Sequence, residues 1–157
     1  MEKLNAGPAD ATTAGEKLRR VVMFALGKER YAVDIAQVQE VCRYSASAVH
    51  GKASGEMLGF ITLHEHEVAL IDVSQCLHLP ALKFSHHTRI LICSATEQIK
   101  GIVVDDIIEV VDLNLDDIQA VSVADNTAEG KLIHEVATYA GQSMRLIDLN
   151  TLFLMAS

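Results

Sequence analysis

Four neighbouring polar residues, His64-Glu65-His66-Glu67, are the first candidates for chemistry in this sequence. Alternate residues of an extended strand face the same way, so His64 and His66 could share a metal ion with His86 and His87 as further ligands. Zinc proteases instead carry H-E-x-x-H on a helix, and that spacing is absent. Mixed polar residues are more often a solvated hairpin tip. We therefore expect no metal, and a histidine-turn metal-binding protein is the alternative.

A second set of candidates consists of four aspartates that follow apolar segments, namely Asp34, Asp72, Asp105 and Asp148. Paired carboxylates can carry out acid–base catalysis. Their recurrence at strand ends instead favours capping, because Asp accepts hydrogen bonds from nearby free backbone N–H groups. No Ser-His-Asp set or glycine-rich phosphate loop stands out. We expect a protein that is not an enzyme and needs no cofactor.

The three cysteines, Cys42, Cys76 and Cys93, are widely spaced among apolar neighbours and form no C-x-x-C motif. An odd number of isolated cysteines indicates buried, reduced thiols that behave as small apolar groups.

Composition narrows the function classes. Half of the 157 residues are apolar, but only 4% are aromatic, so Val, Ile and Leu must fill the core, as is typical of strands. The formal charge is −8, and this acidic balance disfavours nucleic-acid binding. The N-terminal residues lack the apolar segment of a signal peptide, and no apolar run is long enough to cross a bilayer. We expect a cytoplasmic protein without direct membrane insertion.

The elements that must position these residues are predicted as hairpins. Residues 60–63 and 68–73 read as antiparallel strands joined by the turn His64-Glu65-His66-Glu67. Similar strand pairs are predicted at 21–26 with 31–33, 90–93 with 99–104, and 132–139 with 144–149. After the first pair, Asp34 is predicted to cap a short helix, because Ile35, Val38 and Val41 follow at helical spacing.

The chain repeats itself imperfectly over residues 19–77 and 89–154. L-I-D-V at 70–73 returns as L-I-D-L at 146–149, Asp105 corresponds to Asp34, and residues 107–110 correspond to 38–41. Residues 114–131 are predicted to be a polar link, and residues 152–154 either close a barrel or begin a helix. Small antiparallel sheets hide their edges best by curling. We predict two similar β-barrels with a shared core at 19–157, after a flexible tail at 1–18.

F-A-L-G-K-E-R-Y-A-V-D-I-A-Q-V-Q-E-V at 24–41 resembles the opening of the CheW-like family of bacterial chemotaxis coupling proteins. G-I-V-V-D-D-I-I-E-V at 101–110 and the final L-I-D-L resemble its later signatures. The resemblance implies an all-β protein with short helices, built as two intertwined five-stranded SH3-like barrels. It implies a non-catalytic adaptor that couples the regulatory domain of a histidine kinase to the cytoplasmic tip of a chemoreceptor, in chemotaxis or in type IV pilus control.

The resemblance also suggests which residues bind partners: Val38, Glu40, Val41, Leu63, His64, Gly101, Ile107 and Val110. Of these, Val38, Val41, Ile107 and Val110 fit either the shared core or a kinase contact. An ordinary solvated acid is as good an interpretation of Glu40 as a contact residue.

The sequence departs from the family pattern at the first turn. The family usually reads N-L-R-G where this chain has Thr62-Leu63-His64-Glu65. Because Glu resists the positive φ that Gly adopts easily, we expect a different backbone conformation there. His64 takes the place of an Arg that lies beside the Glu of the V-x-E motif, so we expect a pairing of His64 with Glu40 unless His64 simply points into water. A variant barrel with a changed or self-associating partner is a further alternative.

Overall fold

The computed structural model describes residues 17–121 and 128–156, most of them in strands. The predicted tail at 1–18 lies outside the described residues as far as residue 16. The strands are β1 (Leu18–Leu26), β2 (Glu29–Asp34), β3 (Val38–Arg43), β4 (Met57–Leu63), β5 (His66–Asp72), β6 (Arg89–Ala95), β7 (Gln98–Val104), β8 (Asp106–Asn114), β9 (Ile118–Ala120), β10 (Ile133–Tyr139) and β11 (Gln142–Ile147). The helical segments are η1 (Ile35–Gln37), η2 (Ala46–Ala48), α1 (Val73–Cys76), η3 (Leu115–Asp117), α2 (Ala128–Leu132) and α3 (Leu149–Met155).

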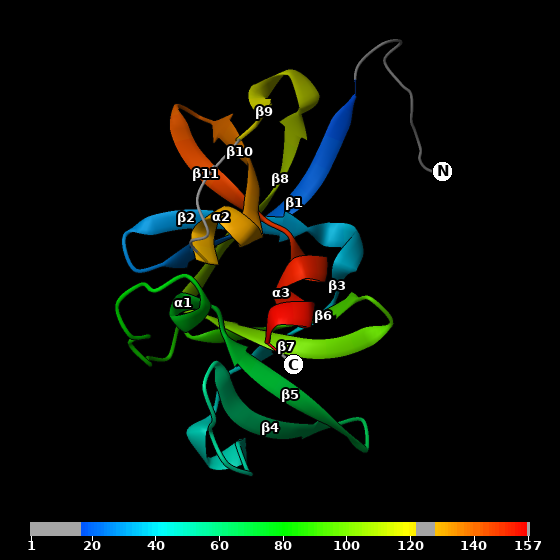
Figure 1. Ribbon diagram of the computed structural model, residues 1–157, viewed down its shortest axis with the longest axis vertical. Coiled ribbons are helices and arrows are strands. Elements are labelled where there is room, and N and C mark those ends of the chain that lie inside the picture. Colours follow the sequence, from blue (N-terminus) through cyan, green and yellow to red (C-terminus); the bar gives the residue numbers. More distant parts are fainter. Residues whose placement is uncertain (1–16, 122–127, 157) are drawn as a thin grey trace.

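The strands form two sheets, one above the other in Figure 1, with α3 between them. The upper sheet has six strands in the order β8-β1-β2-β11-β10-β9. The lower sheet has five strands in the order β3-β6-β7-β5-β4. Parallel pairing joins β2 to β11 and β5 to β7, while every other neighbouring pair is antiparallel.

The two halves of the sequence exchange strands. In the lower sheet, β6 and β7 of the second half lie between β3 and β5 of the first half, and β3 pairs with β6 from Val38 opposite Cys93 to Arg43 opposite Arg89. In the upper sheet, β1 and β2 of the first half lie between β8 and β11 of the second half, and β1 pairs with β8 from Leu18 opposite Asn114 to Ala25 opposite Asp106. Each sheet is therefore built from both halves, which confirms the prediction of two intertwined barrels. The lower sheet has the five strands that the resemblance implies, whereas the upper sheet has a sixth, because the short strand β9 pairs with β10.

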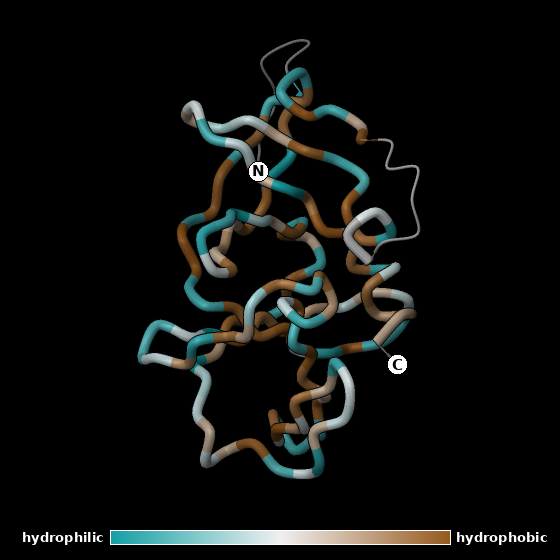
Figure 2. Tube along the Cα trace, turned by 60° about the vertical axis from the view of Figure 1, so that its left-hand side comes forward, coloured by the Kyte–Doolittle hydropathy of each residue, from teal (hydrophilic) through white to brown (hydrophobic). Residues whose placement is uncertain are grey.

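The exchange produces one large core and one smaller core. The large core contains side chains from both sheets and from α1 and α3. The smaller core lies within the upper barrel, where Val21, Met23 and Met144 meet. Successive residues of β1 serve the two cores alternately, because strand side chains point to opposite faces. In Figure 2, brown apolar segments run through the middle of the molecule, and several of the outer turns are teal.

The prediction of free thiols is confirmed for all three cysteines, and the prediction of burial is confirmed for two of them. All three cysteines are free, and Cys76 and Cys93 are buried, while Cys42 is half-buried. Burial raises the pKa of the Cys76 thiol and of the Cys93 thiol to about 12 each, so both stay protonated and unreactive near neutral pH.

Three of the four aspartates cap helical turns as predicted. Asp34 accepts a hydrogen bond from Ala36 N, Asp72 from Gln75 N and Asp148 from Thr151 N. Asp105 does not correspond to Asp34 in this respect, because β8 follows it directly. Its Oδ2 accepts a hydrogen bond from Gly27 N at 2.6 Å instead. In the second half the capping role falls to Asn114, at the start of η3.

The predicted helix at 35–41 is wrong beyond its first turn. Only Ile35–Gln37 is helical, and Val38 begins strand β3. Pairing with β6 overrides the helical spacing, and the β-branched Val38 and Val41 suit a strand. The predicted link at 114–131 is also more structured than expected, since it includes η3, β9 and the start of α2. Residues 152–154 belong to helix α3, the second of the two alternatives.

The turn between β4 and β5 corrects two expectations. It consists of His64 and Glu65 alone, since His66 and Glu67 already belong to β5. Glu65 does adopt positive φ, at 68°, and His64 has φ of 50°. Positive φ at both central residues defines a type I′ turn, which matches the right-handed twist of a hairpin. The twist of the hairpin therefore holds His64 and Glu65 in the left-handed conformation, although that conformation costs free energy in residues other than glycine.

We expect Glu65→Gly to stabilise the protein by about 1 kcal/mol, because glycine removes that cost. The matched control is Glu67→Gly, which removes the same exposed charge from an extended strand and should destabilise by about 0.5–1 kcal/mol. Urea unfolding midpoints measure both changes. A loss of stability in Glu65→Gly equal to that of the control would contradict the turn geometry.

Candidate partner-binding groove

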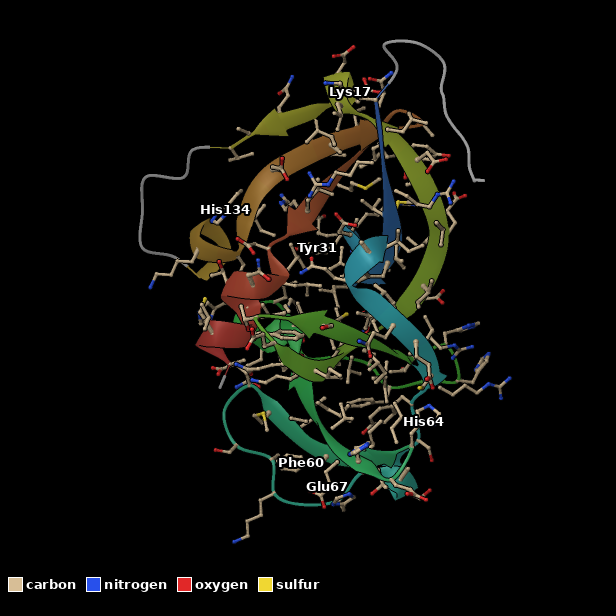
Figure 3. All side chains as sticks on the ribbon, turned by 90° about the vertical axis from the view of Figure 1, so that its right-hand side faces the viewer. Lys17, Tyr31, Phe60, His64, Glu67 and His134 are labelled. Atoms are coloured by element: carbon tan, nitrogen blue, oxygen red, sulfur yellow. The ribbon has the colours of Figure 1, made fainter. Side chains whose placement is uncertain are left out.

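A hydrogen bond joins the two edges of the lower sheet. Glu40 lies on edge strand β3, and His64 directly follows β4, the strand at the other edge. His64 Nε2 donates to Glu40 Oε1 at 2.9 Å. Figure 3 shows His64 at the tip of the β4–β5 hairpin, near the lower end of β3. The pairing expected from the sequence is therefore present.

The hydrogen bond between His64 and Glu40 affects the pKa of Glu40, and Glu40 in turn affects the pKa of Cys42. The hydrogen bond from His64 lowers the pKa of Glu40 below its usual value, and the charge of His64 acts in the same direction. Cys42 Sγ lies 3.6 Å from Glu40 Oε2. Burial first, and then the negative charge of Glu40, raise the pKa of the Cys42 thiol. The Glu40 carboxylate is thus held ionised at this edge.

A groove of about 450 Å³ opens beside this pair. Apolar side chains of Leu63, Val68, Ile92 and Ile99 contribute to its lining. The polar lining residues are Gln39, Glu40, His64, His66, Glu67 and Glu97. The groove therefore offers an apolar surface bordered by three carboxylates and two imidazoles, which suits a partner with apolar side chains and basic neighbours.

The structure brings three of the predicted partner-binding residues together, since Glu40, Leu63 and His64 all line the groove. Val38 and Ile107 pack against the large core. Val41 and Val110 remain half exposed, at 48% and 50%. Of the two roles suggested for the four apolar residues, Val38 and Ile107 thus serve the core, and Val41 and Val110 are free to meet a partner.

Gly101 lies elsewhere, buried in the middle of β7. A Cβ at this position would come within 2.7 Å of Ile90 Cγ2 and 2.8 Å of Leu70 Cδ2. Glycine is needed here because the core side chains approach the backbone closely. Gly101 is not among the residues that line the groove, and its role in partner binding stays a prediction.

Sequence reasoning missed the part of the groove that comes from the β6–β7 hairpin. Glu97 sits in a turn where Thr96 and Glu97 both have positive φ, as His64 and Glu65 do, and Ile99 is 49% exposed just after it. β7 lies beside β5 in parallel, which brings the two hairpins together. The signal available in the sequence was an apolar residue next to a charged turn.

The histidine-rich turn gathers no metal-ligand cluster in the part of the chain that the structure describes: no three of its His, Cys, Asp or Glu residues are grouped to hold an ion. Across residues 17–121 and 128–156, none of the helices has the length and apolar character to span a bilayer.

Comparison with known proteins gives consistent results. The family model of the CheW-like domain matches residues 20–156. The chain is 22% identical to the chemotaxis protein CheW of Rhizobium meliloti over 135 residues, covering 86% of this chain and 87% of that protein. It is 23% identical to the chemotaxis protein CheW of Klebsiella aerogenes over 140 residues, covering 88% of this chain and 84% of that protein.

A solved structure agrees in fold. The scaffolding protein TtCheW from Thermoanaerobacter tengcongensis superposes with a TM-score of 0.78 at 23% identity, covering 87% of this chain and 93% of that chain. The exchanged strands, the two barrels and a family match across nearly the whole chain lead to one conclusion: the chain belongs to the CheW-like domain family.

Proposed function

We propose that this protein is a non-catalytic adaptor of a bacterial chemosensory array, coupling the cytoplasmic tip of a chemoreceptor to the regulatory domain of a CheA-type histidine kinase. Its family membership and its similarity to chemotaxis proteins and to a scaffolding protein support this role. The array controls either chemotaxis or type IV pilus motility, and the adaptor acts in the cytoplasm. The observation that carries the proposal is the groove spanned by Glu40 and His64.

The receptor tip is the partner that we assign to the groove. A helix with apolar residues on one face can dock against Leu63, Val68 and Ile99. Basic residues beside that face would meet the three carboxylates of the groove, which favours one orientation of the partner and speeds encounter.

The kinase is the partner that we assign to the exposed valines. Val41 projects from β3, and Val110 projects from β8. Val41 and Val110 are half exposed, whereas the nearby Val38 packs against the large core and Val111 is buried. We assign these two side chains to the kinase because a partner that covers an exposed apolar side chain removes it from water.

The altered turn is compatible with this function. His64 keeps a hydrogen bond to Glu40, and the turn keeps the positive φ that the usual glycine would have. His64 replaces the permanently charged Arg of the family pattern with a side chain that can titrate, and it keeps the place of that Arg beside Glu40.

The kinase assignment predicts the behaviour of two variants. We expect Val41→Asp and Val110→Asp each to weaken binding of the kinase regulatory domain about tenfold or more, because each buries a charge in an apolar contact. Leu115→Asp is the matched control, since Leu115 is 41% exposed on η3 and should leave affinity unchanged. Titration calorimetry with the purified domain measures the affinities, and urea unfolding confirms that each variant is folded. Folded variants with wild-type affinity would place the kinase contact elsewhere.

The receptor assignment is tested separately with a purified cytoplasmic fragment of the receptor. Ile99→Asp should weaken its binding about tenfold while kinase binding persists, since Ile99 lines the groove and Val41 does not. If Ile99→Asp is folded and its affinity for the kinase domain falls as much as its affinity for the receptor fragment, one surface binds both partners.

The Glu40–His64 contact also predicts a pH dependence. A carboxyl group whose pKa is lowered on folding stabilises the protein above its unfolded pKa, near the ordinary value of 4.5, and this contribution is lost as pH falls through the lower folded pKa. Removing the donor with His64→Ala should therefore raise the titration midpoint of the Glu40 carboxyl, followed by NMR of its side-chain carbonyl carbon. Glu40→Gln should remove only the part of the acid-dependent stability that comes from Glu40.

Asp112 provides an internal control within the same titration. A hydrogen bond from Arg20 lowers the pKa of Asp112, and His64 takes no part in it. Its midpoint should stay unchanged in His64→Ala. An unchanged Glu40 midpoint would show that the two side chains do not interact in solution.

A further inference from the structure

Two long segments of this acidic chain contain no acidic residue. Residues 41–55 and 73–96 are the two longest stretches without Asp or Glu, in a chain that has 21 acidic residues. The structure joins these segments, because β3 pairs with β6 and Arg43 lies directly opposite Arg89. Arg43 is exposed and Arg89 is half-buried. The protein therefore presents a local positive charge where the two segments meet, although its formal charge is −8.

Arg43 and Arg89 form a cross-strand pair of like charges. Side chains directly opposite one another on antiparallel strands lie on the same face, and like charges in this arrangement destabilise the sheet. Arg89 Nη1 donates to His86 O at 2.7 Å and to Thr88 O at 3.0 Å, which holds this guanidinium in place. In the part of the chain that the structure describes, neither arginine forms an ion pair with a carboxylate. The pair thus lacks a counter-charge that would offset its repulsion.

Acidic residues of the neighbouring elements do not neutralise this pair. Glu40, also on β3, points to the opposite face of the strand, where it accepts a hydrogen bond from His64. Asp105 and Asp106 line a cavity together with Lys83 of the loop before β6, and neither forms an ion pair with the two arginines. A carboxylate for the arginine pair must therefore come from a partner.

The arginine pair lies beside an exposed apolar side chain. Val41 and Arg43 are alternate residues of β3 and so share one face of the strand. On that face Val41 lies opposite Leu91, the next residue but one after Arg89. Leu91 is fully buried, whereas Val41 is 48% exposed. The face thus combines one exposed apolar side chain with two adjacent guanidinium groups.

We propose that Arg43 and Arg89 bind a carboxylate of the kinase regulatory domain, next to the apolar contact that covers Val41. This inference rests on the proposed function, since it specifies the chemistry of the kinase contact at Val41. The planar guanidinium fork matches a carboxylate with two parallel hydrogen bonds. A partner carboxylate also supplies the missing counter-charge, so binding relieves the repulsion between the two arginines.

The size of the positive surface favours an acidic protein side chain over a nucleic acid. A nucleic acid presents a long series of phosphates, and beyond the arginine pair these would meet a surface that is acidic as a whole, with a formal charge of −8. A single Asp or Glu side chain, or two neighbouring ones, needs only the two guanidinium groups. Contact with Val41 further requires that the carboxylate lie beside an apolar residue of the partner.

The test measures binding of the purified kinase regulatory domain to the full chain by titration calorimetry. Arg43→Glu should weaken binding about tenfold or more, because it places a like charge against the partner carboxylate. The same variant should unfold at a higher urea concentration than the wild type, since Glu opposite Arg89 replaces a repulsive cross-strand pair with an attractive one. Weaker binding by a more stable protein cannot result from loss of the fold.

Lys131→Glu is the matched control. It makes the same change of charge at an exposed position of α2, which packs against β10 and α3, and it should leave the affinity unchanged. Wild-type affinity in Arg43→Glu, or an equal loss in Lys131→Glu, would overturn this inference and leave the kinase assignment of Val41 intact. Failure of the wild type to bind the domain would overturn the proposed function and this inference together.

Analytical ultracentrifugation of the protein alone tests the other source of a carboxylate, a second copy of this chain. The wild type should sediment as the same species as Arg43→Glu. A wild-type dimer that Arg43→Glu dissociates would assign the arginine pair to self-association and overturn its assignment to the kinase.

Discussion

Burial of the large core between the two sheets is the interaction on which the rest of this structure depends. Phe24 and Tyr31 of adjacent strands stack there with ring centroids 6.3 Å apart, and Phe153 reaches it from α3. Full burial of one such aliphatic or aromatic side chain contributes about 1.5–3 kcal/mol. Exposed polar contacts contribute far less. The fold can therefore tolerate large changes in surface residues, including the substituted turn at His64 and Glu65, while the core keeps both barrels in register.

The exchange of strands between the two halves also forms the groove. Because β3 crosses to the lower sheet, it brings Glu40 to one edge, and the β4–β5 hairpin brings His64 to the other edge. Both edge strands belong to the first half of the sequence, and β6 and β7 of the second half complete the sheet between β3 and β5. The groove also needs the β6–β7 hairpin, which lies beside β5 only because β5 and β7 pair in parallel. The binding surface is thus a product of the whole topology.

Local patterns in the sequence were sufficient for the hairpins, the repeat and three of the four Asp caps, because these depend on residues close together in the chain. The helix expected through Val41 was wrong because pairing of β3 with a strand about 50 residues later decided its conformation. For the site, the family motif pointed to the meeting of Glu40 and His64. A local pattern marks Glu97 and Ile99 only as a charged turn followed by an apolar residue; their place in the groove and the burial of Gly101 follow from strand order, which no local pattern gives.

The pairing of β1 with β8 has a consequence for synthesis of the protein. Leu18 lies opposite Asn114, so nearly a hundred residues must be added before β1 meets its partner. At about 5–20 residues per second, the ribosome needs roughly 5–20 s for that stretch. During this interval Val22 and Phe24 belong to a nascent chain whose upper sheet has no closing strand. A domain with such distant contacts cannot fold half by half as it emerges, so the apolar face of the first hairpin stays exposed until the second half has been synthesised.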